Sequence, residues 1–127
     1  MTREDALNRY LAESRAKAFR PGRHDCATFA AGWVKQIPGV DHARGWRSKY
    51  RTLERGKAML AETGHKDHVA FVAAHLDECP VAFARTGDLA VVEGQGVGIV
   101  SAERVFVLRP DGLGHVSLMR AEKAFRV

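Results

Sequence analysis

Apolar side chains recur at every third or fourth position through the first part of the chain, which is the repeat of an amphipathic helix. The pattern predicts helices over residues 2–18, 26–37, 52–63 and 67–79. Thr2 and Asp5 approximate a capping box for the first helix, and Asp25 and Asp67 are natural N-caps for the second and fourth. Between the second and third helices, residues 40–50 predict a loop with at most a short helix.

The pattern changes from a helical to an extended repeat at Thr86. The predicted strands are residues 88–92, 97–100, 104–108 and 113–118, and Gly94-Gln95-Gly96 is a hairpin turn. Helices followed by strands predict an α+β fold, with a small antiparallel sheet of about four strands packed on the helical layer. We expect one domain over residues 1–127, helical over 1–84 and forming the sheet over 85–127.

A chain of 127 residues is long enough to build one core without disulfides. Its two cysteines, Cys26 and Cys79, do not form the dense set of a secreted disulfide-rich protein, so we expect both to be reduced. No apolar run is long enough for a signal peptide or a membrane span. The sequence therefore predicts synthesis in the cytoplasm without export by that route.

The net charge of +5, from 20 Lys and Arg against 15 Asp and Glu, favours anionic partners such as nucleic acid or a cell-wall polymer. However, the basic residues are spread along the chain, and no zinc-finger spacing, phosphate-binding loop or RNA-binding aromatic motif accompanies them. The charge therefore indicates a solvated face, and nucleic acid is not the expected partner.

Cys26 lies in the first turn of the second predicted helix, directly after a turn. Backbone N–H groups are unpaired at that position and the helix dipole is positive, which favours a thiolate and so a nucleophile. Two other interpretations stay open. Asp25 would place a negative charge beside the sulfur while it caps the helix, and free cysteines are commonly small buried hydrophobes.

Several short segments of the chain follow one another in a definite order. They are Pro21-Gly22-Arg23-His24-Asp25-Cys26, Gly39-Val40-Asp41, Arg47-Ser48-Lys49-Tyr50, Gly87-Asp88-Leu89, Gly96-Val97-Gly98-Ile99 and Ala124-Phe125-Arg126-Val127. A Gly-x-x-Asp-Cys segment that opens a helix, followed by helices and then by these strands, resembles the NlpC-type branch of the papain-like cysteine peptidases. More closely, nearly the whole chain resembles a small family encoded in tail gene clusters of phages and gene-transfer agents, which is itself similar to that branch.

This resemblance implies a papain-like fold in which a thiol attacks an amide carbonyl, a histidine accepts the proton and a third polar residue orients the imidazole. For NlpC-type enzymes the usual substrate is a peptide bond in peptidoglycan. Here Gly96 occupies the place of the histidine, and the place of the orienting residue falls near Leu108. Loss of a general base lowers the rate of catalysis by about a hundred- to ten-thousandfold. The resemblance therefore implies that this chain has lost the histidine and the orienting residue of the catalytic set.

Two other histidines are candidate bases for Cys26. His115 lies on the fourth predicted strand, where alternation places it on one face with Ser117 and opposite Val116 and Leu118. His24 is only two residues from Cys26, although in a turn its ring would pair more naturally with backbone or solvent.

The remaining histidines raise the question of a metal site. His65, His68, His75 and Cys79 include one pair at i, i+4, His75 and Cys79, on one face of the fourth predicted helix. The spacing from His68 to His75 matches no standard zinc pattern, so we predict no metal and no cofactor.

The resemblance implies a structural component of a virion tail tip, made in the cytoplasm of the host bacterium, with other tail-tip proteins as partners. Trp46 and Tyr50 lie among basic residues and are the candidate interface anchors. Two alternatives stay open: a working cysteine hydrolase that cleaves peptidoglycan, with Cys26 as nucleophile and His115 or His24 as base, and a basic nucleic-acid-binding accessory protein, which only the net charge supports.

Overall fold

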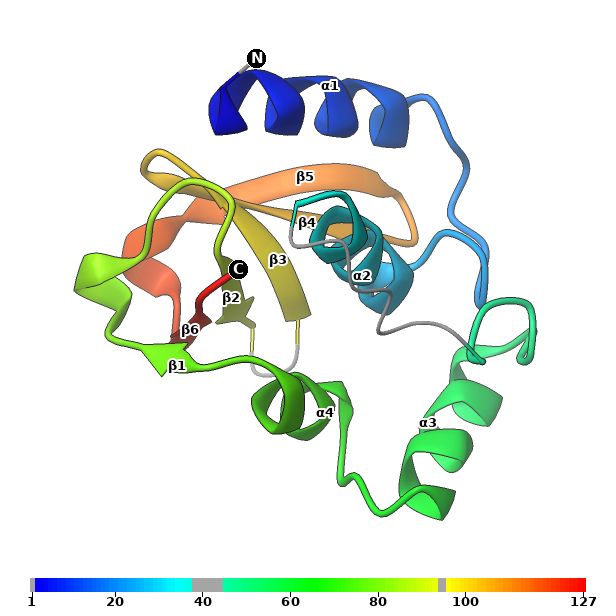
Figure 1. The fold of residues 1–127 in the computed structure, drawn as a ribbon. Coiled ribbons are helices and arrows are strands. Elements are labelled where there is room, and N and C mark those ends of the chain that lie inside the picture. The colour runs from blue at the N-terminus through cyan, green and yellow to red at the C-terminus, as the bar shows by residue number, and fades with distance from the viewer. Residues whose placement is uncertain (1, 38–44, 94–95) are drawn as a thin grey trace.

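The computed structural model describes residues 2–37, 45–93 and 96–127, which form an α+β fold (Figure 1). Its helices are α1 (Arg3–Arg15), α2 (Cys26–Gln36), α3 (Leu53–Glu62) and α4 (His68–His75), with short 3-10 turns η1 (Val81–Phe83) and η2 (Leu118–Arg120). The hairpin residues Gly94 and Gln95, the shared segment Gly39-Val40-Asp41 and the first part of the predicted loop, residues 40–44, lie outside the described residues.

Side-chain caps start the helices where the sequence predicts them. The Thr2 hydroxyl accepts from the Asp5 N–H and the Asp5 carboxylate accepts from the Thr2 N–H, each at 3.1 Å, so the capping box is confirmed. Asp67 accepts from the Ala70 N–H at 2.8 Å and so caps α4. These local contacts satisfy N–H groups that have no partner within the helix.

The end of the fourth helix was predicted wrongly. α4 ends at His75 because Leu76 takes an extended backbone conformation. Cys79 then lies on a strand instead of on the helix, so His75 and Cys79 do not share a helical face.

The sheet has six strands instead of the predicted number of about four. They are β1 (Glu78–Cys79), β2 (Leu89–Val92), β3 (Gly96–Ser101), β4 (Arg104–Arg109), β5 (Gly112–Ser117) and β6 (Lys123–Phe125). The strand order is β1-β6-β2-β3-β4-β5, and every neighbouring pair is antiparallel.

The two strands missed from the sequence are the shortest ones. β1 pairs with β6, Glu78 opposite Phe125 and Cys79 opposite Ala124, and β6 in turn pairs with β2. Strands of two or three residues are too short to produce an alternating pattern, and their pairing joins distant parts of the chain. β1 also lies before residue 85, inside the part predicted to be helical.

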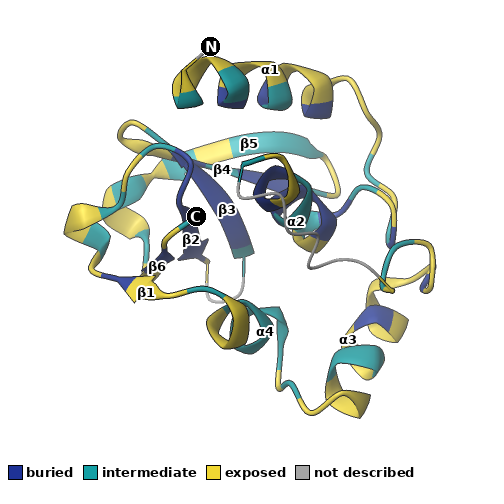
Figure 2. Ribbon diagram, viewed as in Figure 1, coloured by how far each residue is buried: buried dark blue, intermediate teal, exposed yellow. Residues whose placement is uncertain are grey.

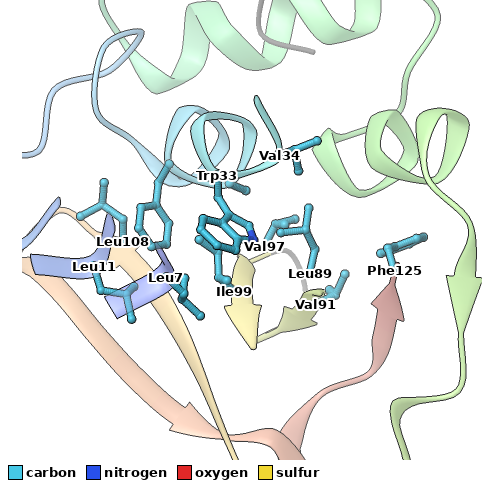
Figure 3. Packing of buried hydrophobic residues seen from close by; sticks show 12 residues of the cluster. Leu7, Leu11, Trp33, Val34, Leu89, Val91, Val97, Ile99, Leu108 and Phe125 are labelled. Carbon is cyan, nitrogen blue, oxygen red and sulfur yellow. The ribbon is translucent and has the colours of Figure 1, made fainter. Parts of the chain in front are cut away.

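The main core lies between the sheet and the first two helices (Figure 3). Trp33 on α2 is fully buried near the centre of this core. The indole N–H of Trp33 donates to the Gly87 carbonyl at 2.7 Å. Leu7 and Leu11 bring α1 onto the same cluster. A second cluster of buried side chains contains Ala90, Val92, Val100, Val105 and Val107.

The third and fourth helices are packed much less completely than α2 (Figure 2). Gly56 is the one buried residue of α3, and α4 buries none of its residues. None of the described helices combines the length and the apolarity that crossing a bilayer requires.

Candidate functional site

Cys26 begins α2 as predicted, with Asp25 as the N-cap. The Asp25 carboxylate accepts from the Thr28 N–H at 2.9 Å, and the Thr28 hydroxyl lies 2.8 Å from the Asp25 N–H, which completes a capping box. The helix start therefore fixes the sulfur at one end of α2, next to the beginning of β3.

The sulfur of Cys26 is held by the backbone of β3. The Val97 N–H donates to Sγ at 3.3 Å, and the thiol donates to the Val97 carbonyl at 3.2 Å. Burial raises the pKa of the Cys26 thiol to about 11, the contact with Val97 opposes that rise, and the negative charges of Asp25 and Glu93 add to it. The expectation of a lowered pKa at this helix start is therefore wrong, and burial of the sulfur is the main cause.

Asp25 is a buried carboxylate with a full set of donors. It is 2% exposed and accepts from the Gly22 N–H at 2.8 Å, from Thr28 and from the Tyr50 hydroxyl at 2.5 Å. Burial, and then the contact with Asp25, raise the pKa of Tyr50 far above its usual value. The aromatic ring predicted as an interface anchor is thus buried, and Tyr50 ties the chain after the loop to the start of α2.

Replacing Tyr50 with phenylalanine should reduce the free energy of unfolding by about 1–3 kcal/mol, since a buried carboxylate loses one of its donors. Urea denaturation followed by circular dichroism measures the change. Tyr10→Phe is the matched control, because the Tyr10 hydroxyl donates to the neutral Phe29 carbonyl at 2.7 Å. We expect the control to lose about 0.5–1.5 kcal/mol. A Tyr50→Phe loss no larger than that of Tyr10→Phe would contradict the importance assigned to the Asp25 contact.

Trp46, the second predicted interface anchor, is half-buried. Its ring packs edge-on against Phe71 of α4, with centroids 5.6 Å apart, and it lines the cavity described below. Its role as an anchor for another protein stays a prediction.

The structure does not bring either candidate base to Cys26. The His24 ring nitrogen Nε2 lies 3.1 Å from the Ser14 carbonyl oxygen, and burial lowers the pKa of this imidazole. His115 is exposed on β5, with its ring centroid 5.4 Å from that of Phe106 on the neighbouring strand. Within the described residues, the sulfur's hydrogen bonds are those with Val97.

The resemblance implies catalytic residues at two other positions, and both of them line the cavity that Cys26 also lines. Gly96 and Leu108 line the same cavity as the sulfur. Glycine and leucine carry no group that accepts a proton or orients an imidazole. At these two positions the chain therefore offers neither a base nor an orienting group for Cys26.

A cavity of about 330 Å³ opens beside Cys26, between α2, α3, α4 and strands of the sheet. Sequence reasoning missed it, although Ala27, Ala30 and Ala31 were a signal: small side chains on this face of α2 leave space that larger ones would fill. His68 and His75 of α4 also contribute to its lining, and the Glu93–Arg109 ion pair borders it. Glu93 directly follows β2 and Arg109 ends β4, so this pair belongs to the sheet side of the cavity.

No group of three or more His, Cys, Asp or Glu side chains in the described ranges is arranged to hold a metal ion. The His75 ring nitrogen Nδ1 lies 2.7 Å from the Phe71 carbonyl, and the His65 and His75 rings flank Phe71 at 5.2 and 4.4 Å. Cys79 lies apart from this cluster, on β1. These imidazoles belong to an aromatic cluster on and around α4.

The model of the family described as "Domain of unknown function (DUF6950)" matches residues 1–127. The chain belongs to this family. A search of curated proteins gave no match. In this DUF6950 chain, the geometry that bears on function is the Cys26 thiol held against β3, the buried Asp25–Tyr50 pair and the apolar cavity that these residues line.

Proposed function

We propose that this chain is a non-catalytic module with a papain-like, NlpC-type fold that serves as a structural component of a phage or gene-transfer-agent tail tip. The order of its parts supports the fold: a cysteine opens a helix that packs on an antiparallel sheet, with the Val97-Gly98-Ile99 segment on the strand beside the sulfur. The resemblance of nearly the whole chain to a tail-cluster family supports the location.

The observation that carries the non-catalytic assignment is the state of the Cys26 thiol. Its pKa is raised to about 11, its hydrogen bonds go to the Val97 backbone, and the charges that act on it are those of the carboxylates Asp25 and Glu93. A cysteine nucleophile needs the opposite environment, with a lowered pKa or an adjacent base. The sulfur therefore packs the start of α2 against β3.

The cavity beside Cys26 favours a second candidate, an active cysteine peptidase or amidase that cleaves peptidoglycan during penetration of the host cell wall. Its lining includes the residues on both sides of the sulfur, Asp25 and Ala27, so the thiol borders a space of ligand size. In that case the protein would hydrolyse peptidoglycan at the tail tip instead of having only a structural role there.

Zymography on purified peptidoglycan separates the two functions. We expect no clearing by the wild-type protein, and the same result for Cys26→Ala. Clearing by the wild type that disappears in Cys26→Ala would establish the peptidase and reject the non-catalytic assignment.

The location is tested on particles. Mass spectrometry of purified virions or gene-transfer agents from a strain that encodes this chain should detect it in amounts comparable to other tail-tip proteins. Its absence from intact particles, together with its presence in the producing cells, would reject the structural role at the tail tip.

A further inference from the structure

The cavity beside Cys26 is incompletely closed by the protein itself. On one side, α2 presents small side chains such as Ala27 and Ala31. On the other side, Leu53 and Leu60 of α3, Phe71 of α4 and Leu76 just after α4 line the space, and none of these four is buried. Apolar side chains from both sides therefore face one common space.

The sequence of α4 supports the same conclusion independently. The helix His68–His75 reads HVAFVAAH, with six apolar residues among its eight, yet it buries none of them. An apolar helix of a globular protein ordinarily buries a face. An apolar occupant of the cavity would complete the burial of Phe71 and Val72 on the cavity side of α4.

The polar groups around the cavity indicate what kind of molecule would fit. Cys26 is already bonded to Val97, Asp25 to Gly22, Thr28 and Tyr50, and Glu93 to Arg109. A peptide or a sugar would bury most of its amides or hydroxyls against a lining that is largely apolar, which is unfavourable. A hydrocarbon chain needs no such partners, and each buried methylene adds about 0.8 kcal/mol.

A basic side chain at the cavity favours an anionic head group on the ligand. Lys57 on α3 is an exposed residue that lines the cavity, and it makes no ion pair with any residue that the structure describes. The chain as a whole carries a net charge of +5. An anionic group at the mouth of the cavity would therefore be attracted both locally and by the overall field.

We propose that this cavity binds a free medium-chain fatty acid, with the hydrocarbon chain between α2, α3 and α4 and the carboxylate at Lys57. Its volume, about 330 Å³, lies in the range of known small-molecule sites. This binding does not depend on the tail-tip location or on the absence of catalysis.

Isothermal titration of the purified full chain with laurate tests the proposal, with butyrate as the short-chain probe. We expect saturable one-to-one binding of laurate, and none of butyrate over the same concentrations. Ala31→Phe, which fills the cavity, should weaken laurate binding at least tenfold, whereas Ala58→Phe, on the exposed part of α3 outside the lining, should not. Circular dichroism of each variant establishes that it is folded.

The charged end is tested separately. Lys57→Gln should weaken laurate binding about two- to fivefold and leave dodecanol binding unchanged, because the contact is an exposed ion pair. Lys35→Gln, an exposed lysine outside the lining, should change neither. No saturable binding of laurate, or equal binding by the wild type and a folded Ala31→Phe variant, would overturn the proposal. If the protein sediments with phosphatidylglycerol vesicles but does not bind laurate, the fatty-acid proposal is also overturned, and the partner is a membrane surface instead.

Discussion

Replacing Trp33 with alanine should lower the free energy of unfolding by about 3–5 kcal/mol, which is the usual cost of removing a large aromatic side chain from a core. Trp33 is 0% exposed and lies between α2 and the sheet, and its indole N–H satisfies the Gly87 carbonyl. The variant loses the packing and also leaves that carbonyl without its donor. Since small domains are stable by only about 5–15 kcal/mol, we expect a large fraction of the chains to unfold on mild heating.

Urea denaturation monitored by far-ultraviolet circular dichroism measures this loss. Trp46→Ala is the matched control, because Trp46 is half-buried and contacts α4 near the surface. It should lose markedly less stability than Trp33→Ala. Equal losses for the two variants would mean that the core is not centred on Trp33, and that the α3–α4 side of the molecule contributes more than its burial indicates.

The helix starts could be predicted because they are local. Thr2 and Asp67 cap their helices through backbone groups three residues away, so the sequence contains both partners of each contact. The middle of the sheet could be predicted for a similar reason: β2, β3 and β4 follow one another with short connections and each carries enough β-branched residues to show an extended pattern. The α+β class follows from that order.

What could not be predicted depends on contacts between distant parts of the chain. β1 and β6 form because Glu78 and Cys79 meet Phe125 and Ala124, and two residues have no pattern of their own. Tyr50, among basic neighbours, indicated a surface, but its hydroxyl reaches a carboxylate 25 positions earlier in the chain. Alternation on β5 indicated the face on which His115 lies, yet not its distance from α2.

The site shows the same division between local and long-range effects. The place of Cys26 at the start of α2 was predicted from local signals and is confirmed. The pKa of its thiol was expected to fall because of the helix terminus, and it is raised because β3 and the surrounding side chains remove water from the sulfur. Whether a cysteine at a helix start becomes a nucleophile is thus decided by what packs over it.

The raised pKa of Cys26 also makes stability depend on pH in the alkaline range. The pKa of the Cys26 thiol is about 11 in the folded protein, which is above its value in the unfolded chain. The stability that the protonated thiol contributes is therefore fully present below the unfolded-state pKa, and it is lost as the pH rises through the folded-state pKa. Cys26→Ala in a Cys79→Ala background should therefore lose less stability between mildly and strongly alkaline pH than Cys79→Ala alone. An equal loss in the two proteins would show that Cys26 is not the group responsible.

Alkylation by iodoacetamide should be slow at Cys26 because the reagent reacts with the thiolate. In a Cys79→Ala background Cys26 is the single cysteine, since the chain has two. The matched control carries Cys26→Ala, Cys79→Ala and Ala27→Cys, which moves the thiol to an exposed position in the same turn of α2. Near neutral pH we expect the Cys26 thiol to react about a hundredfold more slowly than this control, as its raised pKa requires.

The rate of alkylation at Cys26 should keep rising with pH toward the folded pKa of about 11, whereas the rate of the control should level off at a lower pH. Equal rates, or a Cys26 profile that levels off near neutral pH, would mean that the sulfur is activated after all, and the peptidase would then become the better explanation of the cavity beside it.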